Sequence, residues 1–355
     1  MERAFGDQLR LARKRCGYTL RDLAGKLNDS VSAQAISKYE RGLMMPSSDV
    51  LLALADALRT PIDVLMRPPA VCLQEIRFRK VSGLAARECK RMQGEIADLL
   101  QRQHEIEAIL GLDRPECKRV RIKPDQAESL AEKVRRDWQL GIDPIPSMTC
   151  LLEDRGIRVL AHDLPDKVSG LHCLAATGQS GRTISAIVVN RRHNIERRRM
   201  TLAHELFHHL AECSSDRRTE EKAATRFASS LLMPKAHFLA ELGKGRSHFG
   251  YQEFISFKYM YQVSAAAVLM RLASLEIISQ AAVAGAFRSF ASTWRKTEPV
   301  PLPDEKNDSN HELPRRFERL CIGALSEGLI SIRKAVQLLQ LPRGVIAAKV
   351  YGPKS

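Results

Sequence analysis

Residues 201–210 have the sequence TLAHELFHHL and contain the pattern H-E-x-x-H. On a helix, His204 and His208 are four positions apart and therefore share one face. Two neutral imidazoles in that arrangement can bind one zinc ion, and Glu205 can act as general base toward a water molecule there. The other residues of the segment are mostly apolar, which predicts a buried helix. The segment therefore predicts a metal centre on a core helix.

A catalytic zinc takes a third protein ligand and keeps one position open for water. We expect this ligand to be Glu221, thirteen residues after His208. Residues at helical spacing would pack on the first helix and aim this carboxylate at the metal: Glu221, Ala224, Thr225, Ala228 and Leu232. Glu220 is the rival carboxylate, about 100° round the helix. Cys213 and His209 are weaker rivals, and His209 is alternatively a polar edge residue or a partner of a ligand.

Three short segments with strand signals precede the metal helix and predict a small sheet. They are residues 156–160, 170–176 and 183–189. We expect the strand 183–189 to lie beside the metal helix and to pair with an extended substrate through main-chain hydrogen bonds. From residue 195 onward the pattern is helical again, so an α+β region surrounds the metal centre.

The first 66 residues predict five short helices. Thr19 and Ser32 are candidate N-caps, and Gly42 is placed to end the helix that follows Ser32. Pro68-Pro69 marks a boundary. We divide the chain into a helical domain at 1–68, a helical connector at 69–124, an α+β domain at 125–296, a linker at 297–314 and a helical C-terminal segment at 315–355. The linker is rich in Pro, Asp and Asn, which predicts flexibility.

Composition excludes several classes of protein. The 355 residues are 44% hydrophobic and favour two or three folded domains. No apolar run is long enough to cross a bilayer and the start has no apolar signal region, so we expect a cytoplasmic protein without a membrane partner. Eight cysteines without a C-x-x-C pair argue against a disulfide framework and against a thiolate zinc site. The net charge of +15 favours polyanionic partners.

The metal segment and its surroundings resemble the ImmA/IrrE family of metallo-endopeptidases. The matching stretches are 199–205, 221–228 and 231–234, with Phe78-Arg79-Lys80, 138–145, 151–157 and 187–190 upstream. The resemblance implies a zincin-like fold, zinc ligands at His204, His208 and Glu221, and Glu205 as base. It also implies cleavage of helix-turn-helix repressors that control mobile-element or stress genes. Phe207 replaces the family's usual Gly, which would narrow the cleft, and Thr225 stands where Asn is common.

The N-terminal segment resembles the Cro/lambda-repressor type of helix-turn-helix (XRE type). The matching stretches are 17–24, 36–42 and 46–51. The resemblance implies that the helix after Ser32 enters the major groove of double-stranded DNA. The outward candidates are Ser32, Ala33, Gln34, Ser37, Lys38 and Arg41. Gln34 suits adenine, whereas Lys38 or Arg41 suits guanine or phosphate; a solvated surface lysine is the competing interpretation of Lys38.

Together these features predict a multidomain protein: a zinc-dependent endopeptidase fused to a sequence-specific DNA-binding domain. It would regulate transcription by cleaving a helix-turn-helix repressor. The alternative is a DNA-binding regulator whose peptidase fold senses a ligand or partner without proteolysis, or a toxin–antitoxin component. The intact set of His204, Glu205, His208 and Glu221 favours the peptidase, because a pure scaffold has no chemical reason to keep Glu205. Repressors of this class commonly pair on two half-sites, which leaves a homodimer open.

Overall fold

A computed structural model describes residues 2–68, 70–76, 85–112, 119–177, 183–213, 215–243, 245–246, 249–294, 297–303 and 312–352. The stretch Phe78-Arg79-Lys80, which belongs to the family resemblance, and residues 304–311 of the expected linker lie outside these ranges. Within the described ranges, no helix has the length and apolar character that a membrane span requires.

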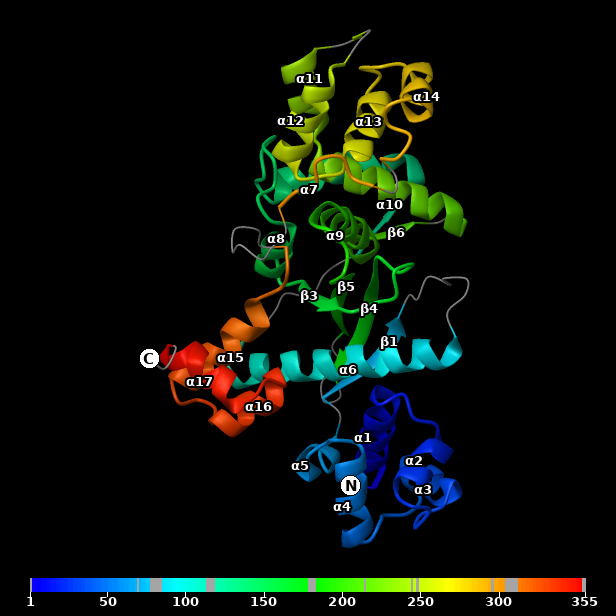
Figure 1. Ribbon diagram of the computed structural model, residues 1–355, viewed down its shortest axis with the longest axis vertical. Coiled ribbons are helices and arrows are strands. Elements are labelled where there is room, and N and C mark those ends of the chain that lie inside the picture. Colours follow the sequence, from blue (N-terminus) through cyan, green and yellow to red (C-terminus); the bar gives the residue numbers. More distant parts are fainter. Residues whose placement is uncertain are drawn as a thin grey trace. The chain divides into compact units, whose positions relative to one another are not determined.

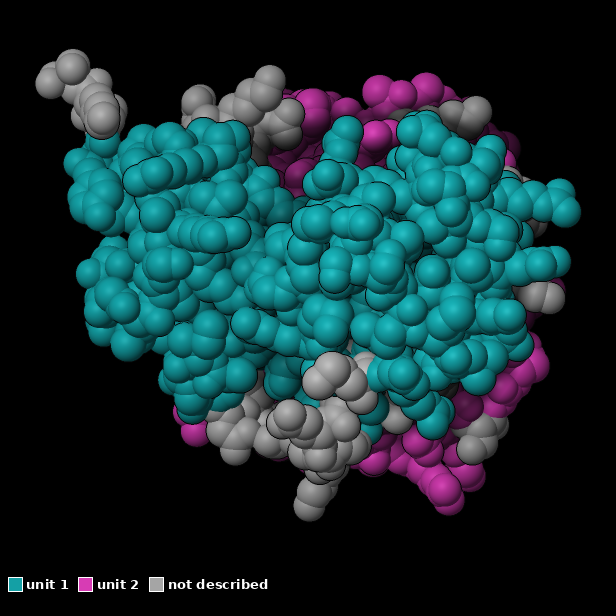
Figure 2. Space-filling view, turned by 90° about the horizontal axis from the view of Figure 1, so that it is seen from below, with its two compact units in different colours: residues 1–116, 173–184, 315–355 teal, residues 117–172, 185–314 magenta. Residues whose placement is uncertain are grey.

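The chain forms two compact units, each built from separate stretches (Figures 1 and 2). Unit 1 comprises residues 1–116, 173–184 and 315–355, and unit 2 comprises residues 117–172 and 185–314. The strands β4 and β5 therefore each contribute residues to both units.

Unit 1 begins with five helices that enclose their own core. They are α1 (Glu2–Arg15), α2 (Leu20–Lys26), α3 (Ala33–Glu40), α4 (Ser48–Ala57) and α5 (Ile62–Leu65). Thr19 forms a capping box with Asp22 at the start of α2, and the Ser32 side chain accepts a hydrogen bond from the Ala35 amide at the start of α3. Both cap assignments made from the sequence are confirmed. Fully buried Phe5 and Ile36 belong to the core that these helices share.

A long helix, α6 (Ala86–Ile109), contacts α1 and also two C-terminal helices of unit 1, α15 (Arg316–Ser326) and α16 (Ile332–Leu339). The last helix is α17 (Arg343–Tyr351). In the first half of α6, a side chain at Gly94 would collide with the backbone of Arg15. Near the end of α6, Ile106 is buried among residues of the C-terminal helices. The C-terminal segment is thus helical, as expected, and it packs on α6.

The segment 69–124 differs from the expected all-helical connector. It contains β1 (Val71–Ile76) before α6 and β2 (Val120–Ile122) after it. Strand β2 pairs in parallel with β6 (Ala211–Cys213), so the chain just after the metal helix becomes part of a two-stranded sheet. The charge and the helical period of the segment indicated helix throughout. The strands could not be predicted locally, because their pairing partners lie about a hundred residues away.

A four-stranded sheet has the order β1-β4-β5-β3, with β3 (Arg158–His162), β4 (Gly170–Thr177) and β5 (Thr183–Asn190). Strand β5 pairs in parallel with β3, with Leu160 opposite Val188. Because β5 lies between β4 and β3, it has no free edge. The expectation that residues 183–189 pair with a substrate is therefore wrong: the sequence indicates a strand but not its order in the sheet.

The remaining elements belong to unit 2. They are η1 (Pro124–Gln126), α7 (Ala127–Asp137), α8 (Met148–Asp154), α9 (Ile195–Leu210), α10 (Arg217–Leu232), α11 (Lys235–Leu242), α12 (Tyr251–Tyr261), α13 (Ala265–Ser274) and α14 (Gln280–Arg288). Helix α10 contacts both α9 and α7, and Leu206 of α9, Ala224 of α10 and Ala131 of α7 are fully buried in one core.

The described ends of the expected linker 297–314 are held within unit 2. The amide of Ala265 donates a hydrogen bond to Glu298, and the amide of Leu302 donates one to Glu196. Glu312 is fully buried and forms an ion pair with buried Arg199 of α9. At these positions the structure shows anchored chain where the composition indicated a flexible linker.

Candidate metal centre

Helix α9, which contains the H-E-x-x-H pattern, is capped at its start and packed on the sheet. The Asn194 side chain caps its start by accepting a hydrogen bond from the Arg197 amide. Leu202, Ala203 and Leu206 are fully buried. A side chain at Gly170 would collide with Thr201 of α9 and with the Val188 carbonyl of β5. This glycine lets α9 lie close to the sheet, as the buried apolar pattern predicted.

Helix α10 supplies the third side chain. Asp216 caps its start by accepting hydrogen bonds from the amides of Arg218 and Thr219. An acidic cap also interacts favourably with the positive end of the helix dipole. Glu221 follows in the next turn, and Ala224 and Ala228 are fully buried in the core shared with α9. Small residues at these two positions suit the close approach of the two helices, which brings the Glu221 carboxylate toward the histidines.

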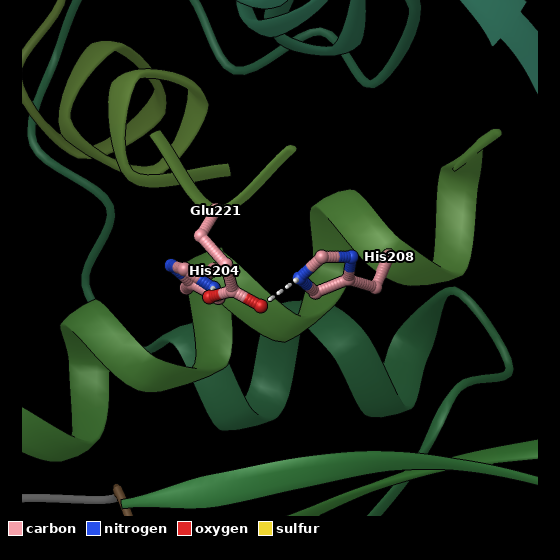
Figure 3. Close-up of side chains that lie close together, drawn as sticks. All are labelled: His204, His208 and Glu221. Carbon is pink, nitrogen blue, oxygen red and sulfur yellow. Dashed lines mark ion pairs between the residues drawn. The ribbon is translucent and has the colours of Figure 1, made fainter. Parts of the chain in front are cut away.

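The three predicted ligands gather at one point (Figure 3). One ligand atom from each of His204, His208 and Glu221 lies within 4.8 Å of the other two. The Glu221 carboxylate is 3.3 Å from His204 Nε2 through one oxygen and 3.9 Å from His208 Nε2 through the other. The side chains of the two histidines are largely buried, whereas Glu221 is partly exposed. One side of the cluster is thus open to solvent.

The donor set fits a zinc ion. Two imidazole nitrogens and one carboxylate oxygen are the ligands that zinc takes in hydrolytic sites. His204 Nε2 is buried and forms no hydrogen bond within the described residues, although the Glu221 carboxylate lies 3.3 Å away. A buried polar atom without a hydrogen bond costs free energy unless a ligand satisfies it. Helical spacing in the sequence predicted the same three ligands.

Two glutamates flank this cluster. Glu205 follows His204 on α9 and is buried. Glu220 places Oε1 at 3.4 Å from His208 Nδ1, on the side of the ring away from Glu221. The rival carboxylate of Glu220 therefore contacts His208, one of the candidate ligands, at Nδ1 of its ring. A carboxylate in that place fixes the ring orientation and leaves Nε2 for a metal.

His209 takes no part in the cluster. Its Nδ1 lies 2.6 Å from the Ser185 hydroxyl of β5, and the same hydroxyl lies 2.7 Å from His172 Nε2 of β4. Burial, helped by the positive charge of Arg119, lowers the pKa of His209 to about 4. His209 is thus a neutral buried contact between α9 and the sheet. Neither partner was predicted from the sequence, where the signal was a serine and a histidine inside apolar strands.

Three other expectations concerned residues near the site. Phe207 is fully buried and its ring lies 5.7 Å from that of Phe227, so it fills the space between α9 and α10. Thr225 is exposed and bonds to the Glu221 carbonyl, so it is not part of the packed stripe. Cys213 lies 3.3 Å from the Ser215 hydroxyl and is not part of the three-residue cluster.

The candidate DNA face lies on α3 in unit 1. Gln34 and Lys38 are exposed one turn apart, and Arg41 follows at the end of the helix. Ala33 and Ser37 are partly exposed on the same helix, while the hydroxyl of Ser32 serves as the N-cap. Buried Glu40 forms a bidentate ion pair with Arg13 of α1. This contact holds the end of α3 against α1.

Comparisons with known families agree with this geometry. Residues 152–273 match the model of the IrrE N-terminal-like domain, and residues 9–65 match that of a helix-turn-helix domain. No curated protein and no solved structure matches the chain. The helix-turn-helix match indicates DNA binding. The chain thus joins an N-terminal XRE-type helix-turn-helix domain to an IrrE-like, metallopeptidase-like domain.

Proposed function

We propose that this protein is a zinc-dependent endopeptidase that regulates transcription by cleaving a helix-turn-helix repressor in the cytoplasm. The supporting observation is the convergence of His204, His208 and Glu221 within 4.8 Å of one another beside Glu205. The family match to an IrrE-like domain over residues 152–273 adds to it.

In this proposal His204 and His208 bind zinc through Nε2, and Glu221 binds it through the carboxylate. Zinc bound there polarises a peptide carbonyl and makes a water molecule more acidic. Glu205 takes a proton from the attacking water and passes it to the amine that leaves. Glu220 acts as a positioning residue, because its contact with His208 Nδ1 keeps the other ring nitrogen directed to the ion.

The DNA-binding domain would bring the peptidase to its targets. Gln34, Lys38 and Arg41 of α3 are exposed and placed to meet base edges or phosphates. A repressor bound at a neighbouring operator would then be present at high effective concentration. This explains why one chain holds both domains, and it makes a helix-turn-helix repressor the substrate that we propose.

Substitution of Glu205 tests the proposal. Glutamine keeps the size of the side chain but removes the basic oxygen, and loss of general-base catalysis typically costs about 10²–10⁴-fold in rate. Zinc-loaded full-length protein is incubated with the repressors encoded beside it, and fragments are identified by mass spectrometry. We expect one defined cut by the parent and none by Glu205→Gln, with zinc and DNA binding unchanged in both.

Glu212→Gln is the matched control, because Glu212 is an exposed glutamate of β6. It should cut like the parent. If cells carrying Glu205→Gln regulate their target genes normally, proteolysis is not the working function, and the peptidase fold would act as a sensor.

A further inference from the structure

The three C-terminal helices form a small domain-like cluster on α6. Their shared core contains Cys321, Ala335, Leu338 and Ile346, all fully buried, together with Ile106 of α6. Helix α15 contacts both α16 and α17, and Glu318 of α15 pairs with Lys349 of α17 at 2.5 Å. Burial raises the pKa of the Cys321 thiol to about 12. The cluster thus has a well-packed interior, and α17 is fixed on it.

The connection between α16 and α17 repeats that between α2 and α3. In each pair a leucine at the end of the first helix is followed by a left-handed residue, Asn28 with φ 53° and Gln340 with φ 54°. In each pair an aliphatic residue that is partly or fully buried directly precedes the N-cap of the second helix, Val31 in one pair and Leu341 in the other. The N-terminal turn is longer by two residues, Asp29, which is also left-handed with φ 55°, and Ser30.

The second helices also correspond. Each begins after an extended N-cap, Ser32 with ψ 152° and Pro342 with ψ 144°. The fourth residue of each helix is a fully buried isoleucine, Ile36 in α3 and Ile346 in α17. Two helices joined by a short turn, with a buried residue that holds the second helix on the core, form a pattern that helix-turn-helix motifs share.

The outward side of α17 suits a close approach to a groove. Arg343, Gly344 and Ala348 are exposed. Arg343 stands in the first turn, where a guanidinium meets phosphate or guanine. Small residues let a helix lie close to base edges, and an alanine methyl contacts the methyl group of thymine.

The net charge of the C-terminal segment favours a polyanionic binding partner. Residues 315–355 hold eight Lys or Arg against two Asp or Glu, a net charge of +6. Residues 1–66 hold ten against eight, a net of only +2. The C-terminal segment is thus more basic than the domain whose family indicates DNA binding. Such an excess is the electrostatic feature expected of a surface that binds phosphates.

We propose that α16 and α17 form a second helix-turn-helix, which binds double-stranded DNA through the face of α17 that carries Arg343, Gly344 and Ala348. The chain then has two DNA-binding elements, one at each end of its sequence and both in unit 1. This inference is independent of the peptidase activity.

The test isolates the second element within the full-length chain. The variant Lys38→Glu first weakens the N-terminal element, because Lys38 lies on the exposed face of α3. In this background Ala348→Glu places a carboxylate on the proposed face of α17. We expect affinity for a fluorescein-labelled mixed-sequence duplex of about 40 base pairs to fall about tenfold at about 0.1 M salt. Arg343→Ala should reduce the salt slope by about one.

Ala282→Glu is the matched control, because it makes the same change at an exposed position near the start of α14 in unit 2. It should leave affinity unchanged, and circular dichroism should show all variants folded. Equal DNA binding by Ala348→Glu and Ala282→Glu would overturn the proposal. Preference for duplex RNA over duplex DNA by the Lys38→Glu chain would overturn it as well.

Discussion

At the residue scale, His208 has a carboxylate near each ring nitrogen. Glu220 approaches Nδ1 at 3.4 Å and Glu221 approaches Nε2 at 3.9 Å. In the proposed site these neighbouring residues of α10 have different roles: Glu220 would orient the ring of His208, and Glu221 would share the metal ion with it. This division explains why two adjacent glutamates, which look interchangeable in the sequence, have separate roles in the proposed site.

Metal analysis of single variants distinguishes these roles. We expect one zinc per parent chain and none in His204→Ala, which loses one of the three ligands. Glu220→Gln should keep zinc but bind it about 10–100-fold more weakly, the usual cost of losing a carboxylate behind a ligand histidine. Zinc content is measured by mass spectrometry and affinity by competition with a chelator. Full zinc retention in His204→Ala would contradict the assigned ligand set.

The sequence predicted this cluster because its spacing is local. His204 and His208 are one helical turn apart, and Glu221 belongs to a stripe that the next helix had to bury. The contact of His209 with Ser185 and His172 was not predictable in the same way. It joins a helix to two strands, and no local pattern encodes which strand lies beneath which residue of the helix.

At the element scale, Glu312 joins α8 to α9. Its carboxylate accepts hydrogen bonds from the amides of Met148 and Thr149 at the start of α8, at 2.9 and 3.1 Å, and also pairs with Arg199. Arg199 further donates to the carbonyls of Ile145 and Pro146. The sequence predicted that Glu312 lies in a flexible linker. Its buried pairing was not predictable, because the partner is more than a hundred residues away.

We expect Glu312→Gln to destabilise unit 2 by about 3–5 kcal/mol, because it leaves the Arg199 guanidinium buried without an opposite charge. Urea unfolding measures the loss. The double variant Arg199→Met/Glu312→Gln should recover part of it, since neither charge then remains. Asp137→Asn is the control, because Asp137 pairs with Lys133 on the exposed surface, where solvent screens the two charges, so its loss should leave the free energy of unfolding almost unchanged. Equal losses in Glu312→Gln and Asp137→Asn would contradict the role of this ion pair.

Strand order is the clearest case in which local pattern was insufficient. The run 183–189 was correctly identified as a strand, but it lies inside the sheet between β4 and β3. Strand β1, which occupies one edge of the sheet, starts in a segment that looked helical by charge and period. Position in a sheet depends on pairing between distant segments, whereas periodicity reports only which faces are buried.

At the scale of the whole molecule, the N-terminal five helices have a core of their own but also support from α6. Arg15 bonds to Asp98 at 3.0 Å, and Arg87 bonds to Asp22 at 3.1 Å. We therefore expect a fragment of residues 1–66 to fold and bind duplex DNA, with affinity that falls steeply with salt. A fragment of residues 1–112 should melt at a higher temperature.

Within the 1–66 fragment, Gln34→Ala should reduce the difference in affinity between preferred and other DNA sequences. Arg41→Ala should lower the affinity for all sequences alike. Fluorescence anisotropy with two unrelated duplexes separates the two effects. Failure of the folded fragment to bind any duplex at low salt would remove the DNA-targeting role of the N-terminal domain.

The division of unit 1 into three stretches has a consequence for synthesis of the chain. The five N-terminal helices can close their core once residue 65 has left the ribosome. Among the described residues, the core around Ile106 of α6 is completed by residues after 315. At about 5–20 residues per second, the ribosome needs roughly ten to forty seconds to travel from Ile106 to the start of α15. During that interval each nascent chain has a folded N-terminal domain and a helix whose apolar side is still exposed. We therefore expect chaperones that bind nascent chains to bind this exposed surface.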